Sequence, residues 1–302
     1  KHFQGRHGLD TDGVVGRETR GALNVPVETR VRQLAANLNR LKSLPPSDGK
    51  PSILINVAAF ELSVVENDRI VFTSPVIVGR LSRPTPVLSS TITRITVNPH
   101  WYVPRLIAVK DILPKVLEDP SYLSAQSIRI YRASDAARTE IPANAIDWRS
   151  LNRNNFPYVL VQDPGPMNAL GQVKFFLPND FDIYLHDTPA QALFNENKRA
   201  FSSGCIRVSK ALELARYLLI KDRSGGFEAM TVALAKRETR QISLKTPVPL
   251  HIVYLTAWAD KSGHAQFRED LYSKDNQLAA LEMAPASVTT CSPAGPQGNA
   301  NR

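Results

Sequence analysis

Cys205 and His186 are the two side chains of this sequence whose types and spacing could carry out nucleophilic catalysis. A thiol becomes a nucleophile when it loses its proton, and an imidazole within hydrogen-bond reach can take that proton. The residues are nineteen positions apart (205 − 186), which leaves room for a strand end, a loop and a return of the chain. The pair predicts nucleophilic catalysis, with Cys205 as nucleophile and His186 as the base that takes its proton.

The residues next to Cys205 favour a reactive thiol. Gly204 permits a tight turn or the close approach of a substrate. Backbone N–H groups around Ser203, Gly204 and Cys205 could bind the oxyanion of a tetrahedral intermediate. Arg207 adds a positive charge, and apolar residues at helical spacing over 209–221 predict a helix whose N-terminus would favour the thiolate.

Each of these residues also has a purely structural interpretation. A lone histidine is more often structural than catalytic, and Cys205 by itself could be a buried, inert thiol. A disulfide with Cys291 is disfavoured, because the surrounding Ala-, Ser-, Pro- and Gly-rich stretch has little reason to lock onto an ordered position. The combination of Cys205 with His186 is what favours catalysis.

We expect neither a metal site nor a cofactor. The sequence contains no C-x-x-C or H-E-x-x-H spacing. Asp12 and Gly13 suggest a calcium loop, but Gly8 and Thr19 occupy the positions where such a loop needs carboxylates.

The elements that must position the pair are mostly strands, so we expect a β-rich α+β fold. Phe181–His186 alternates apolar and polar residues, which places Tyr184 and His186 on one face. Further strands are expected at Ser52–Asn56, Phe60–Val65, Arg69–Val78, Thr91–Val97, Tyr158–Gln162, Val173–Leu177, Gln241–Lys245 and Leu250–Trp258, with helices at 28–43, 106–117, 209–221 and 228–237.

Charge and hydropathy exclude some functions. The 302 residues carry a formal net charge of +9, but basic and acidic residues alternate and no run of five Lys or Arg occurs. An acidic polymer is therefore a possible partner, while nucleic-acid binding is disfavoured by the lack of a motif or a clustered basic segment. No apolar run approaches the roughly 20 residues that span a bilayer.

The motifs around Cys205 and His186 resemble those of YkuD-type L,D-transpeptidases, and in particular of their YcbB-like branch. The signature Ser202–Arg207 contains Ser203 where the family more often has histidine, which leaves His186 as the nearby imidazole. The further segments that carry the resemblance, over about residues 28–275, are 80–86, 98–104, 162–171, Lys174–Phe175, 186–189 and 267–272.

The resemblance implies a domain arrangement. Residues 1–24 are similar to part of a small helical peptidoglycan-binding module, and 25–50 would be a linking helix and linker. Residues 51–284 would form the L,D-transpeptidase catalytic domain, with a capping subdomain inserted at about 98–162, and 285–302 a flexible tail. The family further implies a periplasmic or cell-envelope protein whose targeting segment lies outside this chain.

The resemblance also implies a reaction and roles for individual residues. Cys205 would form a thioester with the diaminopimelate carbonyl of a donor tetrapeptide stem and release D-Ala, and an acceptor stem amine would then resolve it. Tyr184 would support the oxyanion or orient His186, and Arg207 would bind a donor carboxylate. Trp101 and Tyr102 would line the substrate cleft. Peptidoglycan stem peptides are the implied partners, and carbapenems the implied covalent inhibitors.

Two other functions remain open from the sequence. The same site could transfer the acyl group to water, to a D-amino acid, or in the attachment or release of a lipoprotein. A protein that binds peptidoglycan without catalysis would be of another class, although the presence of both His186 and Cys205 argues against it.

Overall fold

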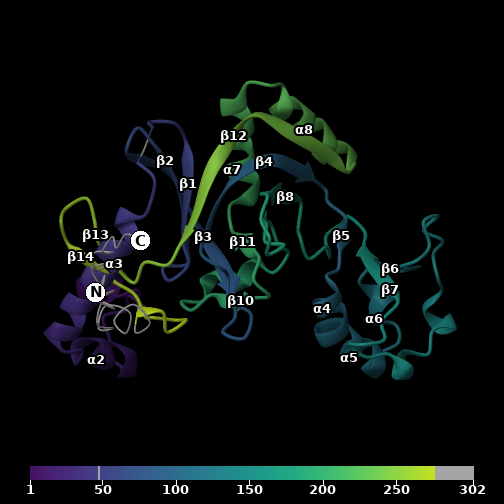
Figure 1. Cartoon of the computed structure of the whole chain (residues 1–302), viewed down its shortest axis with the longest axis horizontal. Helices are drawn as coiled ribbons and strands as arrows, with labels where there is room; N and C mark the ends of the chain where they lie inside the picture. The colour runs from purple at the N-terminus through teal and green to yellow at the C-terminus, as the bar shows by residue number, and fades with distance from the viewer. Residues whose placement is uncertain (47, 276–302) are drawn as a thin grey trace, which may run out of the picture.

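The computed structural model describes residues 1–46 and 48–275, and its centre is one large sheet (Figure 1). In spatial order its strands are β10 (Ala200–Ser202), β3 (Arg69–Gly79), β11 (Ile206–Val208), β9 (Leu185–His186), β8 (Val173–Phe176), β4 (Leu88–Val97), β12 (Arg240–Val253), β1 (Ser52–Asn56) and β2 (Glu61–Glu66). Because β2 also pairs with β3, the sheet closes on itself and β10 is an added edge strand.

The inside of this closed sheet holds the main hydrophobic core. Ile53 and Ile55 on β1 are fully buried and alternate with the half-buried Leu54, as the period of a strand requires. Two helices, α7 (Ala211–Asp222) and α8 (Gly226–Lys236), bury apolar side chains such as Leu214 and Met230 in the same core. The predicted β-rich α+β fold is therefore confirmed.

A second, smaller body is built from the residues between β4 and β8, which we call the insertion (98–172). It contains a three-stranded sheet in the order β5 (Trp101–Tyr102), β7 (Tyr158–Gln162) and β6 (Ile128–Arg132). Its own core includes Ile112, Ile130 and Leu160. The helical segments are α4 (Arg105–Ile107), a π-helical turn (Ala108–Ile112), α5 (Leu113–Glu118) and α6 (Tyr122–Ala125), where the sequence predicted one helix over 106–117.

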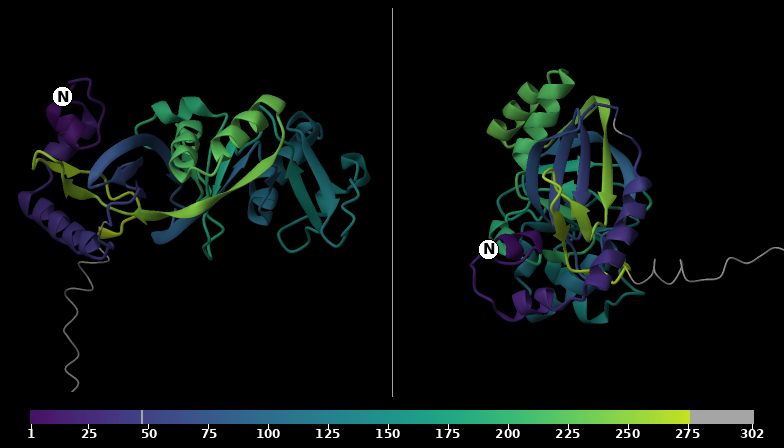
Figure 2. Two further views of the ribbon diagram at one scale, coloured as in Figure 1. Left: turned by 90° about the horizontal axis from the view of Figure 1, so that it is seen from above. Right: turned by 90° about the vertical axis from the view of Figure 1, so that its left-hand side faces the viewer.

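The N-terminal helices lie at the opposite end of the molecule from the insertion. They are α1 (His2–Arg6), α2 (Arg17–Leu23) and α3 (Val27–Lys42), and they pack beside the hairpin β13 (Ala257–Ala259) and β14 (Ala265–Phe267). Figure 2 shows the helices, the closed sheet and the insertion in a row. None of the described helices is long and apolar enough to cross a bilayer.

The helix predicted over 28–43 forms as α3 (Val27–Lys42), but it does not pack through the apolar residues whose spacing predicted it. It packs through polar side chains: Gln33 Nε2 donates to the carbonyls of Thr256 and Arg268, and Asn37 Nδ2 donates to Thr256 Oγ1 at 2.8 Å. The apolar residues stay exposed to solvent, namely Val31, Leu34, Leu38 and Leu41.

The predicted strand Phe181–His186 is wrong over its first four residues, because β9 comprises Leu185 and His186 alone. Asn179 explains the difference. Its Oδ1 accepts hydrogen bonds from the N–H groups of Phe181 and Ile183, and its Nδ2 donates to the Ile183 carbonyl. These local bonds hold a turn, with Asp182 at a positive φ of 53°, in place of a longer strand.

The C-terminal part of the sheet also differs from the expectation. The strands predicted at 241–245 and 250–258 differ from those observed. Residues 241–245 and 250–253 lie on one long strand, β12, whose pairing with β4 shifts register between Ser243 and Val248. Residues 254–256 are in no strand, and 257–258 belong to β13. The predicted tail at 285–302, with Cys291, lies outside the described residues.

Candidate active site

Strand pairing brings the sequence-predicted nucleophile and base onto one face of the sheet. β11 pairs in parallel with β9, so that Ile206 lies opposite Leu185 and Arg207 lies opposite His186. Cys205 directly precedes β11, and the next N–H, that of Ile206, donates to the Tyr184 carbonyl at 3.1 Å. Leu185 and Ile206 point into the core. By alternation Tyr184, His186, Cys205 and Arg207 share the other face.

His186 is held as a neutral base. Its side chain is buried, and its Nδ1 lies 2.5 Å from the Asp187 carbonyl oxygen. A carbonyl accepts hydrogen bonds and does not donate them, so Nδ1 carries the proton and Nε2 keeps the lone pair. Burial and the nearby positive charges of Arg207 and Lys174 lower the imidazole pKa to about 3.

Cys205 is a free cysteine whose thiol stays protonated at rest. Its Sγ contacts the Asp182 carbonyl oxygen at 3.8 Å. Burial raises the thiol pKa, while the N–H and hydroxyl of Tyr184 and the charges of Lys174 and Arg207 act against the rise. The resting site therefore holds a neutral thiol, whose hydrogen-bond partner is the Asp182 carbonyl, and a neutral imidazole on the same face of the sheet.

The expectation that a helix N-terminus activates Cys205 is wrong. The helix starts at Ala211, and the three residues of β11 stand between it and the thiol. Since the effect of a helix dipole is confined to its first turn, it does not reach Cys205. The positive groups that favour the thiolate are the side chains of Arg207 and Lys174.

Lys174 is a site residue that the sequence reasoning did not single out. It pairs with His186 across β8 and β9, and its Nζ lies 3.8 Å from the centroid of the Tyr184 ring. Burial lowers its pKa, whereas the Cys205 thiolate would raise it. A single lysine between Val173 and Phe175 on a buried strand was the signal that could have identified it.

Tyr184 connects the thiol with the insertion. Its ring lies 5.6 Å from that of His186, and burial raises its hydroxyl pKa, so the hydroxyl keeps its proton. It interacts both with Cys205 and with the indole of Trp101, the first residue of β5. Tyr102 is placed differently: it is half exposed, and its hydroxyl accepts a hydrogen bond from Arg138 within the insertion.

The loop before Cys205 is held by its own hydrogen bonds. Ser202 Oγ donates to the Cys205 carbonyl at 2.5 Å and accepts from the Gly204 N–H at 3.1 Å. Thr85 Oγ1 donates to the Gly204 carbonyl at 2.8 Å. Gly204 has a φ of +117°, a conformation that suits glycine, and a Cβ there would lie 3.1 Å from Ile183 Cδ1.

Two arginines that the sequence did not identify as site residues bind the side chain of Ser203. Its Oγ accepts from Arg83 Nη1 at 2.8 Å and from Arg80 Nη2 at 3.2 Å. Asp111, on the π-helical turn of the insertion, pairs with Arg83 at 2.5 Å and with Arg80 at 3.7 Å. One carboxylate therefore links the insertion to the loop that carries the thiol.

Arg207 presents an unsatisfied donor. Its side chain is largely buried, which lowers its pKa, and its Nε has no hydrogen-bond partner among the described residues. An unpaired guanidinium N–H in a buried site is costly unless a ligand completes it.

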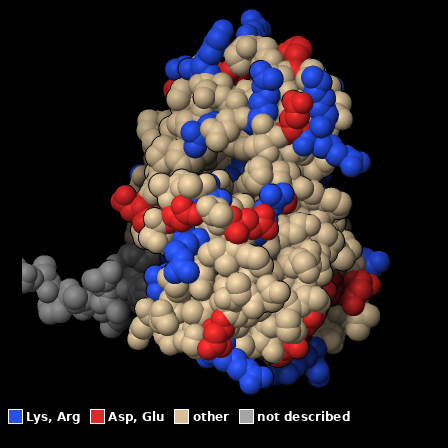
Figure 3. All heavy atoms as spheres, turned by 90° about the vertical axis from the view of Figure 1, so that its right-hand side faces the viewer, with Lys and Arg blue, Asp and Glu red and all other residues tan. Residues whose placement is uncertain are grey.

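In the described part of the chain, no group of three or more His, Cys, Asp or Glu side chains could hold a metal ion. On the face that carries the insertion, basic and acidic side chains are interspersed (Figure 3). This face therefore lacks the single-sign surface that nucleic-acid binding requires.

Two comparisons with known proteins show the family of the chain. Residues 50–248 match the family model of the YkuD L,D-transpeptidase catalytic domain. A Haemophilus influenzae protein named as an L,D-transpeptidase is 35% identical over 252 residues, which cover 83% of this chain and 50% of that protein. The chain thus spans about half the length of this curated relative.

Solved structures show more distant likenesses. An L,D-transpeptidase in complex with imipenem is 16% identical over 67% of this chain and 58% of its own, with a TM-score of 0.28. The catalytic domain of the E. faecium L,D-transpeptidase is 11% identical over 69% of this chain and all of its own, also with a TM-score of 0.28.

Proposed function

The chain belongs to the YkuD family of L,D-transpeptidase catalytic domains, and from this premise we propose that it cross-links peptidoglycan in the periplasm or cell envelope. The observation that carries the proposal is the face of the sheet shared by His186, on β9, and Cys205, which directly precedes β11. The motifs that resemble the YcbB-like branch, together with an insertion that has its own core, support assignment to that branch.

In the first half-reaction Cys205 Sγ attacks the diaminopimelate carbonyl of a donor tetrapeptide stem. The C–S bond forms as the thiol proton passes to His186 Nε2. The C–N bond to D-Ala then breaks, and the same proton goes to the leaving amine. Because His186 has a pKa of about 3, the imidazolium exists only between these two transfers.

The second half-reaction returns the enzyme to its starting state. The amine of an acceptor stem attacks the thioester, its C–N bond forms and the C–S bond breaks. The amine proton passes through His186 to the sulfur. The charges of Lys174 and Arg207 stabilise the thiolate that leaves at this step.

The oxyanion of each tetrahedral intermediate needs donors in the loop 202–205. The Gly204 N–H is bonded to Ser202 Oγ, so Gly204 contributes by its backbone conformation. We assign the donor role to the N–H groups of Ser203 and Cys205, with the protonated Tyr184 hydroxyl in support. The unpaired Nε of Arg207 supports its assignment to a donor carboxylate.

The insertion would act as a cap that keeps water from the thioester. Trp101 supports this role, because its indole interacts with the Tyr184 hydroxyl beside Cys205. Exclusion of water favours an amine over hydrolysis as the second step.

Intact-mass spectrometry after incubation with a carbapenem tests the nucleophile. One adduct is expected on the wild-type chain and none on Cys205→Ala. An adduct that persists in Cys205→Ala, or none on the folded wild type, would refute the assignment.

Product analysis with purified tetrapeptide muropeptides tests the acceptor. Cross-linked dimers are expected, and their formation should stop in Cys205→Ala. Tripeptides as the sole product would show an L,D-carboxypeptidase and overturn the cross-linking proposal.

A further inference from the structure

The face of the sheet that carries Cys205 and His186, which we call the site face, continues across β8 to β4. Beneath it, four buried core residues lie opposite one another on neighbouring strands, namely Ile206, Leu185, Phe175 and Ile95. Because side chains alternate along a strand, the residues on either side of this buried row point to the site face. They form two rows that cross the four strands.

One of the two rows contains the candidate nucleophile and ends at an arginine. The first row consists of Arg207, His186, Lys174 and Thr96. The second row lies one step along the strands and consists of Cys205, Tyr184, Phe176 and Arg94, the last two of which pair across β8 and β4. Since neighbouring strands are about 4.8 Å apart, the backbones of Cys205 and Arg94 are roughly 14 Å apart. That span is comparable with a few residues of extended peptide.

Arg94 is a half-buried cation without a partner of its own. Its guanidinium carbon lies 4.5 Å from the centroid of the Phe176 ring, so the side chain extends over β8, toward Tyr184. Among the described residues it forms no hydrogen bond or ion pair, and its buried Nε lacks an acceptor. Burial lowers the pKa of Lys174, and the charge of Arg94 lowers it further, so the two cations lie near each other. A buried donor of this kind is costly unless a ligand completes it.

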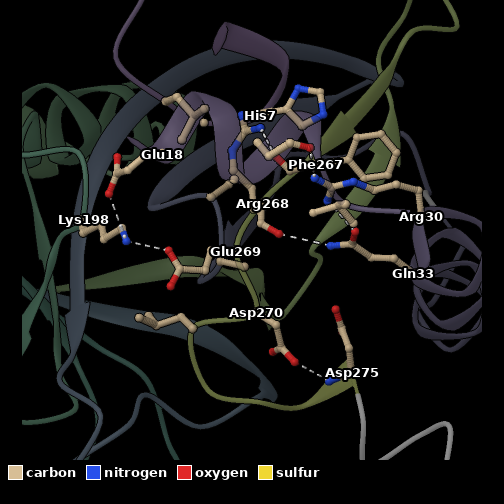
Figure 4. A pocket seen from close by; sticks show the side chains of 18 of the residues that line it. His7, Glu18, Arg30, Gln33, Lys198, Phe267, Arg268, Glu269, Asp270 and Asp275 are labelled. Atoms are coloured by element: carbon tan, nitrogen blue, oxygen red, sulfur yellow. Dashed lines mark hydrogen bonds and ion pairs between the residues drawn. The ribbon is translucent and has the colours of Figure 1, made fainter. Parts of the chain in front are cut away.

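Lys198 illustrates a cation whose charge is balanced within the chain. It lines a cavity of about 990 Å³ beneath the N-terminal helices, where Glu18 and Glu269 share it at 3.4 and 2.7 Å (Figure 4). Arg94 has no such acid among the described residues, so its charge remains available to a ligand.

A second guanidinium on the site face is in the same condition. The buried Nε of Arg207 also lacks an acceptor among the described residues. Arg207 lies on β11 and Arg94 on β4, on opposite sides of Tyr184. Asp182 is an acid between them whose charge acts on Lys174 and Tyr184. The two outer positions stay positive, which suits a ligand that carries two carboxylates.

We propose that Arg94 is a specificity-determining residue of the donor cleft, where it binds a second carboxylate of the stem peptide while Arg207 binds the first. The proposal deepens the proposed function and rests on it for the choice of ligand. A diaminopimelate stem offers one carboxylate on the diaminopimelate side chain and another on the residue before it. Two guanidinium groups that each bind one of these carboxylates fix the register and the direction of the stem over Cys205.

Isothermal titration of the full chain carrying Cys205→Ala with the tetrapeptide stem measures binding without turnover. Addition of Arg94→Gln to this chain should weaken binding by about tenfold or more, because a hydrogen bond to a charged group is lost. Arg94→Lys keeps the charge but not the planar fork, so it should retain part of the affinity. Arg240→Gln, an exposed arginine of the neighbouring strand β12, is the matched control and should bind like Cys205→Ala alone.

Stems amidated at one carboxylate or the other tell which of them Arg94 holds. Amidation of the bound carboxylate should weaken binding about as much as Arg94→Gln does, and both changes together should be no worse than either alone. A merely structural defect would lower the affinity for every stem by the same factor and would leave the effect of amidation intact. Equal affinity with and without Arg94→Gln, or additive effects for both amidated stems, overturns the proposal.

Release of D-Ala by the chain that keeps Cys205 separates this proposal from the proposed function. The wild type should release D-Ala from the unmodified stem, and Arg94→Gln should lower kcat/KM by about tenfold or more. If the wild type binds the stem but releases no D-Ala and forms no carbapenem adduct, the proposed function fails while the titrations still decide the role of Arg94. If the wild type is active and Arg94→Gln changes neither affinity nor kcat/KM, this proposal alone fails. No binding of any stem overturns both.

Discussion

Arg207 lies directly opposite His186 on the neighbouring parallel strand, and its charge helps to keep the imidazole neutral. The same guanidinium favours the thiolate of Cys205. One cation thus acts in opposite directions on the two residues of the proposed catalytic pair: it disfavours the protonated form of His186 and favours the deprotonated form of Cys205. The following predictions start from this arrangement.

Replacement of the base should remove most of the activity. His186→Gln is expected to slow carbapenem acylation by about 10² to 10⁴-fold, the range typical of a general base. Stopped-flow fluorescence and intact-mass analysis measure the rate. His251→Gln is the matched control, a histidine of β12 bonded to Ser89 and absent from the site, and it should acylate normally. Equal rates for His186→Gln and wild type would contradict the assignment.

The pH dependence of acylation should follow the thiol and not the imidazole. Burial raises the Cys205 pKa above its ordinary value of 9.0, so the rate should still be rising at pH 9. The His186 pKa of about 3 leaves the imidazole neutral from pH 5 upward, so no inflection is expected near 6.5. A rate profile between pH 5 and 10 checks this, and a bell centred near neutrality would contradict it.

The same histidine should make the protein sensitive to acid. Its folded pKa is depressed below the unfolded value of 6.5, so the unfolded chain takes up a proton first as pH falls. Stability should therefore be fully present above about pH 6.5 and decline between there and pH 3. Urea unfolding at a series of pH values should show a smaller decline for His186→Gln than for wild type.

Lys174→Met should make the thiolate form of Cys205 less stable without changing the fold of β8. Loss of this cation is expected to raise the apparent thiol pKa and so to reduce acylation at pH 7.5. A higher pH should restore much of the rate, which a purely structural defect would not allow. Titration of thiol reactivity with iodoacetamide gives the pKa directly, and an unchanged value would disprove the role.

Gly204→Ala should damage the site through the backbone. An alanine at a φ of +117°, 3.1 Å from Ile183, costs about 1–3 kcal/mol and displaces the loop before Cys205. Acylation should fall by more than tenfold. Gly263→Ala is the control, because it has a φ of +79° with nothing near its Cβ and lies in the β13–β14 turn. That variant should lose stability and keep its acylation rate.

The Asp111 link between the insertion and the thiol loop is testable with a double-mutant cycle. Asp111→Asn and Arg83→Gln should each slow acylation several-fold, and the double variant should be no slower than the worse single one. A coupling of roughly 1 kcal/mol is expected for a half-buried pair. Additive effects would mean that the pair does not act as a unit on Ser203.

The sequence predicted the strands of the sheet well where alternation is strong and unbroken. Ser52–Asn56 and Tyr158–Gln162 have the predicted bounds. The turn at Phe181–Tyr184 escaped prediction, because Asn179 competes for backbone hydrogen bonds that a strand would otherwise use. Helix α3 was found from its apolar spacing, yet its packing through Gln33 and Asn37 depends on partners more than two hundred residues away.

The sequence identified only those residues of the candidate site that lie in two short motifs. Cys205, His186, Tyr184 and Arg207 come from two short segments, and strand pairing unites them. Lys174, Arg80, Arg83 and Asp111 enter from β8, from the loop after β3 and from the insertion. No local spacing predicts such contacts, because they arise from the order of strands in the closed sheet.

The attachment of the insertion has a consequence for engineering. Val97, where the chain leaves the sheet, pairs with Val173, where it returns, and the Asn98 N–H donates to the Gln172 carbonyl at 2.8 Å. The chain thus enters and leaves the insertion at one position of an antiparallel strand pair, where a two-residue turn would suffice to join the strands. An insertion exchanged between relatives at this position would therefore have to keep the contacts of Asp111 with Arg83 and of Trp101 with Tyr184 if the loop before Cys205 is to stay in place.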